Sequence, residues 1–215
     1  MTALHDRFFA AFARDPQRLR VARSPDLPPD MLSDERVAPP WVVWKLLPGR
    51  HALQVYRDWE ERNGWRLPES FRAFLMARQT LRLDCGIARL VASPSHAPFL
   101  DLEELMEWDV PLIRAKKLLP VGDEAIGEVG PLCLDLRERT PEPPVVYCDA
   151  AEDTVSPPIW SSLPKMLEGL SFAMENDLRL WEDERLLEAF LALDPAGAGG
   201  PGREYWSRDA EEDGE

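Results

Sequence analysis

The segment that decides the fold covers residues 60–75 and reads EERNGWRLPESFRAFL. Gly64 accepts the left-handed backbone angles that commonly end a helix, so a helix over residues 51–63 is predicted to stop there. Pro68 is predicted at the first position of a second helix, because its fixed φ is already helical there and its missing N–H leaves no bond unmade. The apolar side chains that follow have the i, i+3, i+4 spacing of a buried stripe: Phe71, Phe74 and Leu75.

The residues after this helix pair predict a sheet with further helices. Residues 81–92 have the alternation of one strand, with a change of phase near Gly86. Ser161 or Ser162 precedes apolar residues at helical spacing and is predicted to cap a helix. Three more short strands are predicted from apolar runs over residues 118–121, 132–136 and 145–148. Two more helices are predicted over residues 101–108 and 177–193.

The sequence predicts a central domain with an extension at each end. Residues 1–49 begin with a helical pattern that Pro16 limits and continue as a proline-rich loop, so they are predicted to be an N-terminal extension packed on the core. Residues 50–194 are predicted to be the α+β domain, including a C-terminal helix. Residues 195–215 combine a glycine-rich run with an acidic end, which predicts a linker followed by a disordered tail.

The order of these elements resembles that of the SUKH superfamily, the Smi/Knr-like proteins, over residues 50–172. The shared features are a helix ending at glycine, a Leu-Pro opening a Phe-rich helix, a strand ending in glycine, a strand ending near aspartate, and a serine-capped closing helix. Residues 76–80 depart from the pattern, because they replace an Asn-Gly-Gly-like turn. The resemblance implies an α+β fold, with a twisted, mainly antiparallel sheet packed by helices and helical N- and C-terminal extensions.

The same resemblance implies a class of function. It implies no conserved chemistry, and it transfers no catalytic or binding residue. Many bacterial members look like immunity proteins that bind and neutralise a cognate toxin, often a nuclease, whereas others look like scaffolding or regulatory proteins. We therefore expect a non-enzymatic protein-binding domain, with an adaptor that has no toxin partner as the alternative.

Composition places the chain among globular proteins of a reducing compartment. Apolar residues make up 45% of its 215 residues, which is an ordinary share for a domain with a core. The sequence has no run of about 18 apolar residues that could span a membrane and no apolar signal core at its start. Its three cysteines have no Cys-x-x-Cys pair, so we expect buried core thiols and a cytoplasmic location.

Charge is distributed unevenly along the chain. The first 100 residues carry 15 Lys and Arg against 11 Asp and Glu, whereas the remaining residues carry 10 against 28. A net charge of −14 repels nucleic acid and anionic lipid, so neither is expected as a partner. It attracts basic proteins within a Debye length of about 8 Å at physiological salt. The expected partner is therefore another protein, and a basic toxin domain fits best.

No catalytic or metal-binding motif appears in the sequence. The three histidines are far apart and lack zinc-binding spacing, so no metal or other cofactor is expected. Cys148 stands beside Asp149, and a neighbouring carboxylate disfavours a reactive thiolate. A small hydrolase with a site on the sheet stays a further alternative, because paired acids such as Asp123 and Glu124 could serve acid–base chemistry in a pocket.

Three acidic groups are the candidate contact residues for a protein partner. The first is on the predicted helix over residues 101–108, and the other two follow predicted strands, where binding residues often lie. Trp108, Tyr147 and Trp160 stand near them and would suit a binding hot spot if exposed. The candidate residues are Asp101, Glu103, Glu104, Glu107, Asp109, Asp123, Glu124, Glu128, Asp149, Glu152 and Asp153.

Overall fold

The structure is a computed structural model that describes most of the chain. The described residues are 2–108, 110–125, 130–149, 152–178 and 184–207.

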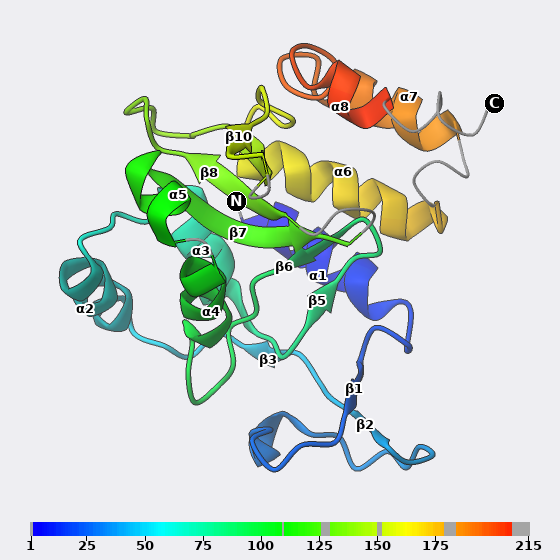
Figure 1. Ribbon diagram of the computed structural model, residues 1–215. Coiled ribbons are helices and arrows are strands. Elements are labelled where there is room, and N and C mark those ends of the chain that lie inside the picture. The colour runs from blue at the N-terminus through cyan, green and yellow to red at the C-terminus, as the bar shows by residue number, and fades with distance from the viewer. Residues whose placement is uncertain (1, 109, 126–129, 150–151, 179–183, 208–215) are drawn as a thin grey trace.

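An antiparallel sheet of six strands forms the centre of the fold, with strand order β10-β9-β8-β7-β6-β5 (Figure 1). Every neighbouring pair runs antiparallel. The strands are β5 (Leu83–Asp84), β6 (Ala88–Leu90), β7 (Leu118–Glu124), β8 (Pro131–Asp135), β9 (Val145–Asp149) and β10 (Thr154–Val155). Helices pack against this sheet, so the predicted α+β class is confirmed.

The prediction of one strand over residues 81–92 was wrong. Strands β5 and β6 form a hairpin, in which the Cys85 N–H donates to the Ala88 carbonyl at 2.9 Å. Gly86 occupies the turn with φ of 84°, a left-handed value that glycine adopts without strain. The change of phase seen in the sequence at Gly86 was therefore a reversal of the chain.

The helix pair predicted from residues 60–75 is present as α2 (Leu53–Asn63) and α3 (Glu69–Ala77). Gly64 ends α2 with φ of 70°, as predicted. Pro68 precedes the first helical residue of α3 and so lies one position earlier than predicted. The turn is also fixed by Glu60, whose carboxylate accepts a 2.7 Å hydrogen bond from the Leu67 N–H.

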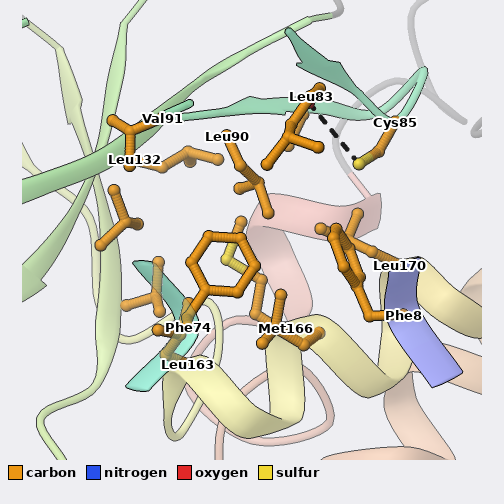
Figure 2. Close-up of a cluster of buried hydrophobic side chains, with 14 of the residues drawn as sticks. Phe8, Phe74, Leu83, Cys85, Leu90, Val91, Leu132, Leu163, Met166 and Leu170 are labelled. Atoms are coloured by element: carbon orange, nitrogen blue, oxygen red, sulfur yellow. Dashed lines mark hydrogen bonds between the residues drawn. The ribbon is translucent and has the colours of Figure 1, made fainter. Parts of the chain in front are cut away.

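The main core lies between the sheet and a layer of helices formed by α1 (Thr2–Ala13), α3 and α6 (Leu163–Asn176). Ser162 caps α6, because its side chain accepts a hydrogen bond from the Lys165 N–H, so the capping prediction is confirmed. Figure 2 shows side chains of these helices gathered with side chains of the sheet. They include Phe8, Phe74, Leu90, Leu132, Met166 and Leu170, each at most 3% exposed.

Short elements complete the first half of the chain. Strand β1 (Arg20–Ala22) pairs with β2 (Trp41–Val43), and β3 (Leu47–Pro48) pairs with β4 (Arg78–Gln79). A 3-10 turn, η1 (Pro29–Met31), lies between β1 and β2. After β6 come α4 (Leu100–Trp108) and α5 (Val110–Ala115), which both contact β7.

Helix α7 (Glu184–Leu193) occupies the end of the helix predicted over residues 177–193. Residues 195–207, predicted as a linker, are folded as a series of turns and α8 (Arg203–Ser207), and together with α7 they form the C-terminal extension. Trp206 is 4% exposed and packs edge-on against Trp160 and Phe190. A Cβ atom on Gly197 or Gly202 would overlap backbone atoms of residues 158–161, so these glycines permit close packing. The predicted acidic tail lies outside the described residues.

Candidate protein-binding surface

Two of the α4 carboxylates hold the fold together. Asp101 accepts a 3.0 Å hydrogen bond from the Ala92 N–H, and its burial raises the pKa of the carboxyl. Glu103 accepts a 2.9 Å hydrogen bond from the indole N–H of Trp59 and so ties α4 to α2. These two acids have structural partners and are not free contact groups.

The other two acids of α4 point to solvent. Glu104 and Glu107 are exposed, and among the described residues neither forms a hydrogen bond or an ion pair. Their i, i+3 spacing places them on one face of the helix. Leu100, at the start of α4, is 41% exposed. This face therefore offers two unpaired negative charges on the same helix as one exposed apolar side chain.

Asp123 and Glu124 at the end of β7 are buried, which corrects their assignment as exposed contact residues. Asp123 is 8% exposed and pairs with Arg89 of β6 at 2.8 Å. Burial raises the pKa of the Asp123 carboxyl, although the guanidinium of Arg89 opposes this effect. Glu124 is 4% exposed and accepts a hydrogen bond from the Tyr205 hydroxyl. A protein partner could not reach these two carboxylates without a rearrangement of the fold.

The connection between β9 and β10 contains three more predicted contact residues. Asp149 accepts a 3.0 Å hydrogen bond from the Glu152 N–H. Asp153 has φ of 51° and pairs with Lys116 at 3.1 Å, and Lys116 also donates to its backbone carbonyl. Glu152 is exposed, and no described residue pairs with its side chain. Of the three acids, Glu152 is therefore the free one.

The remaining candidates are two acids that the structure does not describe and two buried aromatic residues. Asp109 and Glu128 lie outside the described residues. Tyr147 and Trp160 are 7% and 1% exposed, so these aromatic rings belong to the core and not to a surface hot spot.

Strands β7 and β9 are both antiparallel to β8, which brings Glu124 and Asp149 to the same end of the sheet. The exposed candidates that the structure describes without a partner are Glu104, Glu107 and Glu152.

Besides Trp59, three side-chain partners of the acidic residues could not be predicted from the sequence. Arg89 reaches Asp123 because strand register places these two residues opposite each other. Tyr205 comes from the C-terminal extension, and Lys116 follows α5. None is near its acid in the sequence, so only the register of the sheet and the path of the chain reveal the pairs.

A cleft of about 750 Å³, which no pattern in the sequence predicted, lies at the opposite edge of the sheet from β10. It lies between the N-terminal extension, the β5–β6 hairpin and the end of α6. Its lining includes Arg18, Arg20, Trp41, Arg82, Asp84 and Ile87. Three arginines, three aspartates and Trp41 thus line the cleft at the edge of the main sheet that ends in β5.

The described residues contain no group of three His, Cys, Asp or Glu side chains that could hold a metal ion. Cys85, Cys133 and Cys148 are all buried free thiols. Burial raises the pKa of Cys85 and of Cys133, which disfavours the reactive thiolate form.

In the part of the chain that the structure describes, no helix has the length and apolar character needed to cross a membrane. The fold is an α+β domain on which Glu104, Glu107 and Glu152 are exposed. The model of the SMI1 / KNR4 family (SUKH-1) matches residues 55–169, more than half of the chain. The chain belongs to this family, as the sequence resemblance indicated. No curated protein matches the chain.

Proposed function

We propose that this chain is a non-enzymatic, protein-binding immunity protein of the cytoplasm. It neutralises a basic toxin domain, such as a nuclease made by the same cell, by covering the toxin's positive surface. Membership of the SMI1 / KNR4 family (SUKH-1) supports a recognition role. The chain's net charge of −14 supports a basic partner, because opposite charge speeds encounter.

The observation that carries the proposal is the unpaired acidic face of α4. Glu104 and Glu107 are exposed on this helix, which lies inside the segment that the family model matches. A carboxylate that already has an internal partner would lose that bond on binding, whereas these two have none to lose among the described residues. Glu152 adds a third free carboxylate in the β9–β10 connection. We propose Glu104 and Glu107 as the centre of the interface.

The test is charge reversal on this face with a matched control elsewhere. The full chain would capture its partner from a lysate of its own cell, and co-expression of the captured protein with the chain would show whether growth is restored. Glu104→Lys/Glu107→Lys should lower the association rate about tenfold or more at low salt. Glu61→Lys/Glu188→Lys makes the same change in net charge at two other exposed acids and should lower it far less.

Three outcomes would each contradict a different part of the proposal. Equal effects of the two double variants would show that net charge acts without the α4 face. A captured protein that is harmless when expressed alone would show an adaptor and remove the toxin. An effect that does not shrink as salt rises would contradict the electrostatic mechanism, because exposed charges are screened by ions.

A further inference from the structure

Strand β5 leaves the sheet with an open backbone edge. It is the outermost strand on its side, and Figure 1 shows it at the margin of the sheet near α1. Cys85 and Ala88 are hydrogen-bonded to each other across the hairpin, so the pair next to them, Asp84 and Arg89, is a non-hydrogen-bonded pair. The N–H and C=O groups of Asp84 therefore point away from β6, toward the cleft that Asp84 lines.

The same cleft contains an arginine that has no counter-ion among the described residues. Arg20 is half-buried, and within the described residues its guanidinium forms neither a hydrogen bond nor an ion pair. The two neighbouring arginines differ: Arg82 pairs with Asp84 at 2.9 Å, and Arg18 lies 4.0 Å from Asp15. A guanidinium has five donors and binds a carboxylate through two of them at once. Arg20 thus offers a site for a carboxylate brought by a ligand.

Acidic side chains in the lining do not cancel this charge. Asp15 and Asp84 are already bound, since they accept hydrogen bonds from the Gln17 and Gly86 N–H groups and face Arg18 and Arg82. The third, Asp177, is exposed at the end of α6, where solvent screens it. Arg20 is more enclosed than Asp177, so its charge acts more strongly on a ligand inside the cleft.

An aromatic side chain completes the cleft. Trp41 of β2 is 45% exposed, the largest exposed fraction among the large apolar side chains that the structure describes. It lines the cleft together with Ile87 of the hairpin turn. An indole left in solvent costs free energy that a ligand with an apolar group would recover by covering it.

From these three features we propose that the cleft binds an extended acidic peptide, which adds as a strand to β5. The peptide backbone bonds the free N–H and C=O groups of Asp84, an Asp or Glu side chain reaches Arg20, and an apolar side chain covers Trp41. Strand addition takes its affinity from main-chain hydrogen bonds and its specificity from alternate side chains. Arg20 and Trp41 lie outside the segment that the family model matches, whereas β5 lies inside it.

A peptide fits these features better than other anions. Nucleic acid has no amide backbone that could extend β5, so it would leave the N–H and C=O groups of Asp84 unused. A small carboxylate could bind Arg20 but would leave the edge of β5 and the Trp41 ring unused. The proposed site is distinct from the α4 face, so a failure of either proposal leaves the other standing.

The test uses the full chain and fluorescently labelled octapeptides in which Glu alternates with Val or Phe. Fluorescence polarisation should show saturable binding of an acidic peptide and none of its companion with Lys in place of Glu. Arg20→Glu should weaken binding about tenfold or more, as expected for loss of a hydrogen bond between charged groups. Arg57→Glu, which reverses an exposed arginine on α2, is the matched control and should leave binding unchanged.

A second measurement tests the strand addition without changing the protein. Peptides with an N-methyl group on one central residue lose a backbone donor but keep their charge, and one such position should abolish binding. The proposal is overturned if no acidic peptide binds, if the Lys series binds equally well, or if Arg20→Glu and Arg57→Glu act alike. Unchanged binding throughout the N-methyl series would also overturn it, because a peptide held by charge alone does not extend the sheet.

Discussion

Replacing Asp194 with alanine should detach the C-terminal extension from the domain. This carboxylate is 1% exposed and accepts hydrogen bonds from the N–H groups of Ser161, Gly197 and Ala198, at 2.6, 3.2 and 3.4 Å. The first bond has the length of a strong charge-assisted bond, and the other two are weaker. Hydrogen bonds to charged groups contribute about 1.5–3 kcal/mol, and donors left buried without an acceptor add to the loss.

We expect Asp194→Ala to lower the free energy of unfolding by about 3 kcal/mol. For a chain of this length, that loss lowers the thermal midpoint by about 6–12 °C. Urea titration followed by tryptophan fluorescence reports the global transition through the chain's eight Trp residues, among them Trp206, which packs on Trp160. Hydrogen exchange should show the largest loss of protection in α7 and α8.

Two further variants make the result decisive. Asp194→Asn keeps one carbonyl oxygen as an acceptor and should lose clearly less than the alanine variant. Asp34→Ala removes an exposed carboxylate and should change the free energy of unfolding by less than about 0.5 kcal/mol. If Asp194→Ala were no less stable than Asp34→Ala, Asp194 would not hold the extension in place.

Two more predictions concern helix α1 and the turn between α2 and α3. Burial lowers the pKa of His5 below 6.5, so the neutral imidazole is favoured in the fold. Its contribution to stability is present above pH 6.5 and is lost as pH falls from that value through the lowered pKa of the folded state. His5→Phe should flatten this part of the pH profile in urea titrations, and an unchanged slope would contradict the assignment. Glu60→Ala should cost about 1–2 kcal/mol by removing the acceptor of the Leu67 N–H. The exposed neighbour Glu61→Ala should cost little in the same assay, so equal losses would refute the role of Glu60 in the α2–α3 turn.

Local signals in the sequence predicted where α2 ends and where α6 begins, but they did not predict α5 or α8. Gly64 and Ser162 act through backbone angles and hydrogen bonds within a few residues, so their effect is visible without the fold. The β5–β6 hairpin was missed because Gly86 can mark either a bulge in one strand or a turn between two. Only the pairing of Asp84 with Arg89 distinguishes these cases.

For the acidic site, the sequence predicted the excess of carboxylates but not which of them are exposed. Charge counts revealed an excess of carboxylates but could not separate Glu107, which is exposed, from Glu124, which is buried. That difference arises from contacts between distant residues, such as the hydrogen bond from Tyr205 to Glu124. The glycine-rich residues 197–202 were wrongly predicted to be a linker. Composition does not distinguish a flexible glycine segment from one in which the missing side chain permits close packing.

The docking of Trp206 has a consequence for how the domain can be cut. The family segment ends at residue 169, yet Trp160 inside it makes its ring contacts with Phe190 and Trp206, both beyond that boundary. A fragment that ends at residue 169 would expose the indole ring of Trp160. It would also lack Tyr205, whose hydroxyl donates a hydrogen bond to Glu124. Such a fragment should aggregate, so the smallest unit that behaves as this protein includes residues up to at least 207.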